Sequence, residues 1–287
     1  MRHLIGVICY KMTEVLKINV DLLSPEIDFI LHVDKKSRIS DFNFLRGKVN
    51  FLDERRDVKW GDFSQVEVML DLMKYALDNN YDFLSIISET DLPLKTSKEI
   101  NSFLARNKIS YIGKMSDSDC VASEYRIKYQ FPKFIRRRPT FKSRVFMFLR
   151  FYKLFYNNRF DDLGTLKLYK GSQWMTLSND ALRYIFNFLR ETPNYIQIFE
   201  NSFCSDEHFF HTILFNSNLP IFEVVQDGDS INGLRYIDWK SGPDFPKLLR
   251  AENIDLYRSQ QPDSIFFRKV TDDSDFDRYK RLLFTKY

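Results

Sequence analysis

The sequence predicts an α/β protein in which a Rossmann-like mixed sheet, rich in parallel strands, is flanked by helices. Short apolar runs alternate with amphipathic helical runs over the first 90 residues, which is the pattern of βαβ units. The chain has 287 residues, 44% of them hydrophobic, which is enough for a sizeable core. Because no repeat or low-complexity linker divides the chain, we expect a single domain over residues 1–287.

The first half contains the clearest elements. Its strands are expected where apolar residues run together, at 3–10, 26–32 and 81–88. The stretch 14–23 is compatible with a helix. A second helix is expected over 65–78, because its apolar residues recur at helical spacing and Ser64 can act as the N-cap.

Polar stretches follow two of these strands, HVDKKS at 32–37 and SETDLPLKT at 88–96. Ligands bind beyond the carboxyl ends of parallel strands, so we expect both stretches at one site. The first strand is followed by CYKMTEV, which has neither the GxGxxG nor the Walker pattern. Phosphates of a bound nucleotide would therefore be neutralised by side chains.

The second half is less regular, and two helix starts stand out. Ser178 precedes apolar positions at helical spacing, so it is expected to cap a helix. Ser205 is expected to cap another, which would place Asp206, Glu207 and His208 in its first turn.

The chain has three cysteines, Cys9, Cys120 and Cys204, far apart in the sequence. An odd, scattered set favours a reducing compartment over a disulfide framework. The apolar run before Lys11 is too short for a signal peptide, and no stretch of about 18 apolar residues occurs. We therefore expect a cytoplasmic protein, either soluble or peripheral on the inner face of the plasma membrane.

The net charge of +4 conceals a basic aromatic segment at about residues 126–160, which contains eleven Lys or Arg and no Asp or Glu. Residues 141–156 are predicted to form a helix with apolar side chains on one side and basic ones on another. Such a helix suits an anionic membrane. A core-packed helix with a solvated basic rim is equally compatible, and nucleic acid is the least favoured partner.

Six short stretches occur in a consistent order between His32 and Lys269: LHVDKKS, VKWGDFSQVE, SETDLPLKT, KGSQWMTLS, CSDEHFFHTIL and FFRK. Together they resemble the core-2/I-branching N-acetylglucosaminyltransferase family, which also contains the peptide-O-xylosyltransferases. The chain looks like a bacterial-type member. The resemblance implies a GT-A type fold, inverting transfer from a UDP-sugar, and no required metal.

By this resemblance Glu207 is the general base. An inverting displacement needs one carboxylate to accept the proton of the attacking hydroxyl. The alternative for Glu207 is a first-turn acid that stabilises a helix N-terminus. Arg235 and Lys269 are expected on the diphosphate, where fixed cations stabilise the departing UDP as a metal would.

The resemblance also suggests donor contacts. Asp34 and Lys36 match positions that contact the uracil in the xylosyltransferase branch, although a solvated charged turn is an equal alternative. Asp91 matches the acid of an Asp-Tyr-Pro element, in which Leu92 replaces the aromatic residue. Three more residues match the wall of the donor and acceptor pocket: Ser172, Gln173 and Trp174. Trp174 is equally compatible with a core position.

The sequence offers two weak alternatives for a metal site. His208 and His211 are three residues apart, but zinc needs at least three protein ligands and only two other histidines exist. Asp-x-Asp occurs at 117–119 and 227–229, and both stretches are typical of turns or loops. We predict no metal and no other cofactor.

The sequence thus predicts a metal-independent inverting glycosyltransferase. It would move a sugar, GlcNAc by preference, from a UDP-sugar to a hydroxyl of a glycan or lipid-linked acceptor in bacterial surface polysaccharide synthesis. Two alternatives stay open. One is xylose as the donor sugar, and the other is a catalytically silent, membrane-associated protein for glycan binding or assembly.

Overall fold

The computed structural model describes residues 1–137, 140–155, 160–222, 225–226, 229–230, 233–243 and 246–285. The described strands are β1 (His3–Cys9), β2 (Asp28–Val33), β3 (Asn50–Phe51), β4 (Phe83–Ser88), β5 (Leu92–Pro93), β6 (Ser110–Ile112), β7 (Met175–Ser178), β8 (Ile221–Phe222), β9 (Val225–Gln226), β10 (Asp229–Ser230), β11 (Arg235–Ile237) and β12 (Phe266–Arg268).

The described α-helices are α1 (Glu14–Leu23), α2 (Ser64–Asp78), α3 (Ser97–Asn107), α4 (Asp117–Ser123), α5 (Tyr125–Lys128), α6 (Lys133–Arg137), α7 (Phe141–Phe148), α8 (Asn179–Glu191), α9 (Asn194–Glu200), α10 (Phe209–Phe215), α11 (Ile254–Gln260) and α12 (Phe276–Phe284). Short 3-10 turns complete the elements: η1 (Ile39–Leu45), η2 (Phe151–Leu154), η3 (Phe160–Leu163), η4 (Ser205–Glu207) and η5 (Ala251–Asn253).

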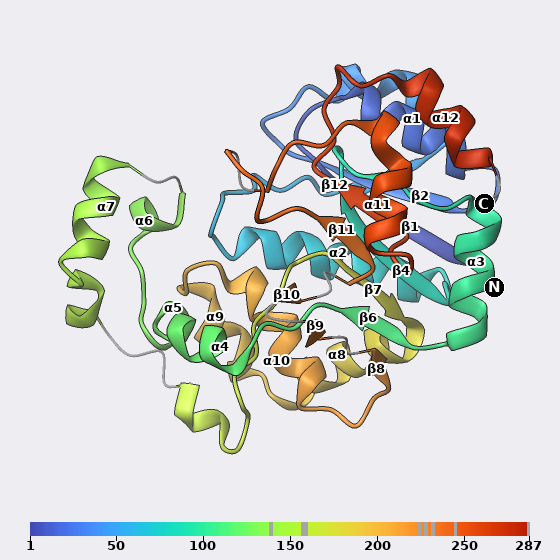
Figure 1. The fold of residues 1–287 in the computed structure, drawn as a ribbon. Helices are drawn as coiled ribbons and strands as arrows, with labels where there is room; N and C mark the ends of the chain where they lie inside the picture. Colours follow the sequence, from blue (N-terminus) through green and yellow to red (C-terminus); the bar gives the residue numbers. More distant parts are fainter. Residues whose placement is uncertain are drawn as a thin grey trace.

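A seven-stranded mixed sheet in the order β3-β2-β1-β4-β7-β6-β8 forms the centre of the molecule (Figure 1). Strand β1 runs parallel to both β2 and β4, while β7 runs antiparallel to β4 and β6. A smaller sheet, β11-β12-β5, lies beside it. This is the predicted architecture of a mixed sheet flanked by helices, and the predicted parallel half is the half built from the N-terminal strands.

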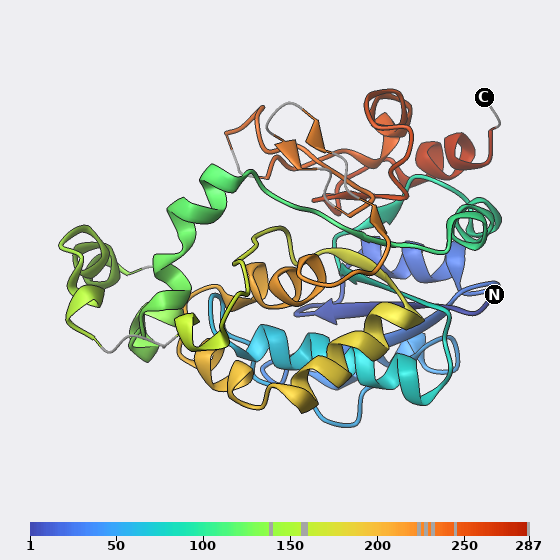
Figure 2. The same ribbon diagram turned by 90° about the horizontal axis from the view of Figure 1, so that it is seen from below.

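Helices cover both faces of the sheet, so its central strands are buried on both sides (Figure 2). On one face α2, α8 and α10 share a core with β4 and β7. On the other face α1 and α3 pack on β1 and β2. The small sheet, α11 and α12 form a third core against α1. Burial on both faces explains why β1 and β4 read as continuous apolar runs.

Local sequence explains most of the element boundaries. Helix α1 matches the predicted range, and Thr13 caps it by accepting a hydrogen bond from the Leu16 amide at 3.0 Å. Ser178 caps α8 as predicted. The prediction for Ser64 is wrong: Phe63 is the N-cap of α2, and Ser64 is its first residue, with an Oγ that accepts from the Lys59 amide at 3.0 Å.

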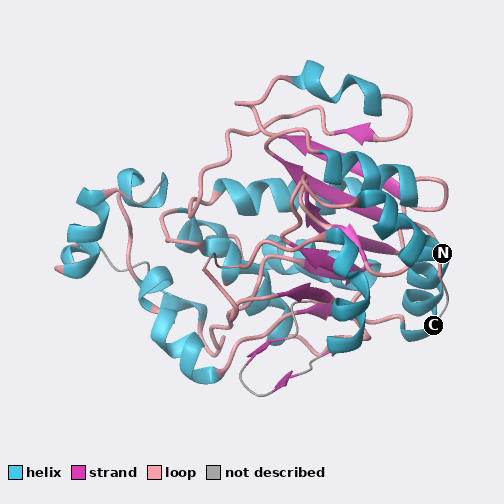
Figure 3. Ribbon diagram, turned by 45° about the horizontal axis from the view of Figure 1, so that its top comes forward, coloured by secondary structure: helices cyan, strands magenta, loops and turns pink. Residues whose placement is uncertain are grey.

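The basic aromatic segment is not the single helix that the sequence predicts over 141–156. Helix α7 ends at Phe148, and Arg150 has a left-handed backbone conformation that leads into η2. Tyr156 lies outside the described residues. Helices α6 and α7 project away from the sheet and its covering helices (Figures 1 and 3). None of the described helices combines the length and apolar character that a bilayer crossing requires.

Candidate functional site

A cleft of about 940 Å³ opens where loops from both halves of the chain meet. Its principal lining segments are Trp60–Gly61, Lys170–Trp174, Asp206–Glu207, Tyr236–Ser241 and Arg268–Lys269. One of these segments precedes β7, and two others include the last residues of β11 and β12. Glu207, Ser172, Gln173, Trp174 and Lys269, which were predicted separately as site residues, therefore share one cavity.

Glu207 lies in the wall of this cleft, between two cations. Its Oε2 accepts a hydrogen bond from Arg126 at 2.9 Å and lies 3.4 Å from Lys170 Nζ. About a third of the side chain is exposed. The Glu207 carbonyl accepts from the Gly171 amide at 2.9 Å, which ties this turn to the opposite lining segment. The carboxylate is thus oriented, charged partners are in place, and solvent still reaches it.

The turn that carries Glu207 differs from the predicted helix start. Residues Ser205–Glu207 form the 3-10 turn η4, and α10 begins only at Phe209. Cys204 has a left-handed backbone with a φ of 53°, and its amide donates to the Gly61 carbonyl at 3.0 Å. Glu207 therefore sits on a tight turn before the helix, which points to a positioned side chain rather than an ordinary helix-capping acid.

Asp206, the neighbour of Glu207, is buried. Burial raises the pKa of the Asp206 carboxyl well above its usual range, and the negative charge of Glu207 raises it further. An unfolded chain would release this proton near the ordinary pKa of about 3.9. Stability from Asp206 is therefore fully present below that pH and decreases as pH rises toward the folded pKa.

We expect Asp206→Asn to make the protein less sensitive to rising pH. Because Asn stays neutral and keeps an acceptor oxygen, the gap in unfolding free energy between pH 4.5 and pH 7.5 should shrink by roughly 1–4 kcal/mol. Urea unfolding at both pH values measures this gap. The exposed acid Asp263 provides the control variant, Asp263→Asn. A gap equal to that of the parent would show that Asp206 does not titrate in this range.

His208 and His211 lie in the interior of the protein, behind the cleft wall. Both are fully buried, and His208 Nδ1 lies 3.0 Å from the Tyr169 carbonyl. Burial lowers the pKa of His211 to about 3, so the ring is neutral. A Cβ placed on Gly171 would lie 2.5 Å from His211 Nε2 and 2.0 Å from the Gly113 carbonyl. The cleft wall therefore packs directly on this histidine.

Arg268 is held in the cleft by a stacked ring and a buried carboxylate. Its guanidinium carbon lies 3.9 Å from the centre of the Trp174 ring, and its Nε donates to Asp91 Oδ1 at 3.0 Å. Asp91 is fully buried and also accepts from the amide and hydroxyl of Ser88. A stacked and ion-paired guanidinium loses little freedom when it meets an anion, because its geometry is already fixed.

Two of the predicted donor contacts, Arg235 and Asp91, lie outside the residues that line the cleft. Arg235 is fully buried outside the cleft lining, and it donates to the carbonyls of Ile86 and Met175 at 3.0 Å each. Burial lowers the pKa of Arg235 to about 9. Arg235 thus joins β4, β7 and β11 through buried hydrogen bonds. Asp91 likewise lies behind the cleft surface, where it positions Arg268.

The remaining predicted contacts of the pocket wall lie in the cleft. Lys269 is exposed and lines it next to Arg268. Ser172 Oγ accepts from the Trp174 amide at 3.4 Å, which fixes the turn before β7. Trp174 combines the two alternatives that the sequence left open, because its ring is mostly buried in the main core and also lines the cleft under Arg268.

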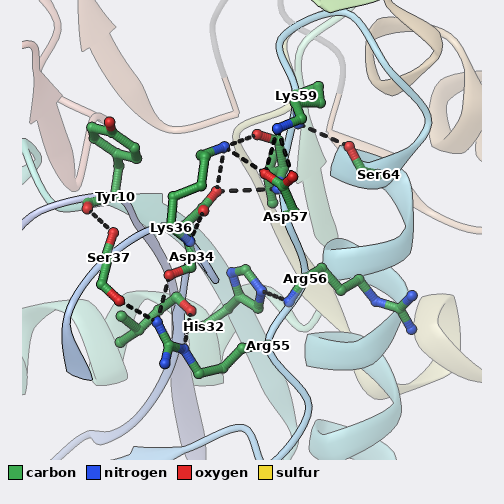
Figure 4. Close-up of polar contacts among 12 residues, drawn as sticks. Tyr10, His32, Asp34, Lys36, Ser37, Arg55, Arg56, Asp57, Lys59 and Ser64 are labelled. Carbon is green, nitrogen blue, oxygen red and sulfur yellow. Dashed lines mark hydrogen bonds and ion pairs between the residues drawn. The ribbon is translucent and has the colours of Figure 1, made fainter. Parts of the chain in front are cut away.

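Asp34 and Lys36 form a separate polar network at the carboxyl end of β2 (Figure 4). Asp34 is buried and accepts from the amides of Lys36 and Val58, at 2.8 and 3.1 Å. Lys36 Nζ lies 3.1 Å from Asp34 and 3.0 Å from Asp57. Neither residue lines the 940 Å³ cleft. Their network instead holds the segment that leads to Trp60, which does line it.

Within the described ranges, no three or more His, Cys, Asp and Glu side chains gather into a group that could hold a metal ion. Asp117 and Asp119 of the first Asp-x-Asp lie in the first turn of α4, where Ser116 caps the helix. Asp227 and Gly228 of the second lie outside the described residues. The two ion pairs that the structure gives Glu207 are with basic groups, Arg126 and Lys170.

Sequence reasoning missed three residues of the site, Arg126, Lys170 and Arg268. Lys170 and Arg268 lie within two of the recognised motifs, KGSQW and FFRK, so the motifs themselves were an available signal. Arg126 had none, because it belongs to the basic aromatic segment and meets Glu207 across 81 residues of sequence.

Comparison with known proteins decides the family. The Core-2/I-Branching enzyme model matches residues 10–261. The chain belongs to the Core-2/I-Branching enzyme family. This is a family of glycosyltransferases, and its GT-A type fold agrees with the mixed sheet described above. The family match includes every predicted site residue except Lys269, which lies beyond residue 261.

Relatives within this family are distant. The chain is 24% identical over 234 residues to xylosyltransferase oxt of Drosophila melanogaster, covering 76% of this chain and 24% of that protein. It is 27% identical over 227 residues to xylosyltransferase 2 of Rattus norvegicus, covering 74% of this chain and 23% of that protein. The chain thus spans about a quarter of the length of these relatives.

One solved structure with partial similarity is mannose-1-phosphate geranyltransferase from Thermus thermophilus. The match has 9% identity and a TM-score of 0.35, and it covers 77% of this chain and 68% of that one.

Proposed function

We propose that this protein is a metal-independent inverting glycosyltransferase that transfers a sugar from a UDP-sugar to a hydroxyl of a glycan or lipid-linked acceptor. The observation that carries this proposal is the cleft itself, in which one oriented carboxylate, Glu207, shares a cavity with the cations Arg268 and Lys269. That is the set of charges an inverting displacement needs. Family membership supports the same reaction class.

In the proposed reaction Glu207 accepts the proton of the acceptor hydroxyl. Both cations near Glu207 contact Oε2, so we assign the incoming proton to Oε1. The hydroxyl oxygen forms a bond to C1 of the sugar as the bond between C1 and the UDP oxygen breaks. The electron pair of that bond leaves with the diphosphate, where Arg268 and Lys269 stabilise the developing charge.

The donor is a UDP-sugar with either GlcNAc or xylose. GlcNAc is the sugar that the family resemblance suggests, while the names of the relatives favour xylose. We place the acceptor in bacterial surface polysaccharide synthesis and the enzyme in the cytoplasm. The three cysteines support a reducing compartment, because all are buried free thiols.

We expect UDP release from the correct donor to continue undiminished in excess EDTA, because fixed cations rather than a metal ion stabilise the leaving group. The measurement is UDP formation from UDP-GlcNAc and UDP-xylose with a panel of acceptors. A thermal-shift screen of the same donors identifies the one that stabilises the folded state. Activity that disappears with EDTA and returns with Mn²⁺ would contradict the metal-free mechanism. Absence of stabilisation by every UDP-sugar would contradict the proposed function.

A further inference from the structure

Helix α7 has an apolar face that points away from the molecule. Phe141, Val145 and Phe148 stand four and three residues apart, so they share one side of the helix, and they are 82%, 38% and 85% exposed. The buried side carries Ser143 and Phe146. A surface helix normally presents polar residues to water. This helix also has large apolar side chains on its outward side. We therefore expect another apolar surface to cover Phe141, Val145 and Phe148.

The exposed apolar surface is concentrated in this part of the chain. Seventeen large hydrophobic side chains are exposed among the described residues, and eight of them lie within residues 134–155. They include Leu149 at the end of α7 and Leu154 in η2, which is 81% exposed. Isolated exposed apolar residues are normal, whereas a contiguous group marks an interaction surface.

Basic side chains border this apolar surface. Lys142 and Arg144 lie on either side of the stripe formed by Phe141, Val145 and Phe148, and both are exposed. Arg150 and Lys153 follow in the next turn and are also exposed. Residues 126–160 contain no Asp or Glu, so this segment supplies no acidic side chain of its own beside these cations.

We propose that the exposed side chains of α7 and η2 form a docking surface for an anionic phospholipid bilayer. The aromatic and aliphatic residues would enter the boundary between headgroups and acyl chains, while the cations pair with lipid phosphates. A second copy of this chain fits less well, because its own docking surface would bring like charges together.

The docking surface packs on the segment that carries α6, because Phe146 of α7 shares a buried cluster with Phe131 and with Ile135 of α6. Arg136, which is almost fully buried, pairs with Asp62 at 3.1 Å and donates to the Glu200 carbonyl at 2.9 Å. At the root of the segment, Arg126 contacts Glu207. The same short stretch therefore carries both the docking surface and a partner of the carboxylate. If the proposed function holds, docking brings lipid-linked acceptors to the cleft.

The test is co-sedimentation of the full chain with vesicles of phosphatidylcholine alone and of phosphatidylcholine with phosphatidylglycerol. We expect binding only to the anionic vesicles. Binding should decrease markedly at about 0.5 M salt, because salt at this concentration screens the attraction between surface charges. Phe141→Ser combined with Phe148→Ser should weaken binding at least about tenfold, because two large apolar contacts are removed.

A matched control replaces two exposed apolar residues elsewhere, Leu256 and Phe284, which are 52% and 62% exposed. Leu256→Ser with Phe284→Ser should bind anionic vesicles like the parent. Equal binding to neutral vesicles, or parental binding by the Phe141 and Phe148 variant, would overturn the proposal. The proposal would also be overturned if the parent formed a dimer in sedimentation velocity, the Phe141 and Phe148 variant did not, and the parent bound no vesicles.

The docking proposal and the proposed function fail in different ways. The Phe141 and Phe148 variant should keep parental thermal stability, UDP binding and turnover on a water-soluble acceptor. Vesicle binding without any UDP-sugar turnover would leave the docking surface in place and refute the transferase. Turnover without binding to anionic vesicles would support the transferase and refute the docking surface.

Discussion

Glu207→Gln is expected to reduce glycosyl transfer by about 10²–10⁴-fold, the range that general acid-base catalysis contributes. Glutamine matches the size of glutamate and can still accept from Arg126 through its amide oxygen, so the turn η4 should keep its form. It cannot accept the proton of the acceptor hydroxyl. UDP binding, measured by titration calorimetry, should therefore remain close to that of the parent while turnover decreases.

Glu200→Gln is the matched control, because Glu200 is exposed and lies seven residues away on α9. Its turnover should equal that of the parent. Unchanged turnover of Glu207→Gln would remove Glu207 from the role of base. Loss of UDP binding together with turnover would instead indicate that Glu207 holds the donor site together, which is the role of a structural acid.

The result also discriminates between an enzyme and a silent glycan-binding member of the family. A silent member needs no base, so its Glu207 would serve only to orient Arg126 and Lys170. In that case the donor would bind equally well to the parent and to Glu207→Gln, and neither would release UDP. A parent that turns over, beside a variant that still binds UDP but does not turn over, is compatible only with a catalytic carboxylate.

Local signals predicted several strands and helices well because these elements are self-contained. Strands β1 and β4 are mostly apolar and are buried on both faces. Helices α1 and α8 carry Thr or Ser caps whose side chains bond the first turn. Each of these features depends on residues within four positions of one another. Tertiary context had little opportunity to override them.

The site was predicted only in part, because its decisive contacts join distant segments. Trp174 meets Arg268 across 94 residues of sequence, and Arg126 meets Glu207 across 81. No local pattern distinguishes an arginine buried in the core, such as Arg235, from one that lines the cleft, such as Arg268. The left-handed conformation of Cys204, which makes η4, similarly depends on Gly61 far upstream.

Arg268 and Arg235 should respond in opposite ways to substitution, because one lies in the cleft and the other in the core. Arg268→Met combined with Asp91→Asn removes the stacked cation without leaving a buried carboxylate unpaired. We expect it to lower turnover by about 10²–10³-fold, as the loss of a transition-state contact does, with little change in unfolding free energy. Asp91→Asn alone should have a smaller effect on turnover, because Arg268 stays stacked on Trp174.

Arg235→Met should instead destabilise the fold by about 2–4 kcal/mol, because it leaves the buried carbonyls of Ile86 and Met175 without their donor. Its remaining folded fraction should turn over at a rate near that of the parent. Urea unfolding and turnover per folded molecule separate the two cases. If Arg235→Met is stable but has lost turnover, and the Arg268 variant retains turnover, then Arg235 rather than Arg268 binds the diphosphate. In that outcome the donor would have to bind with β11 displaced from β4 and β7, a rearrangement that the buried hydrogen bonds of Arg235 oppose.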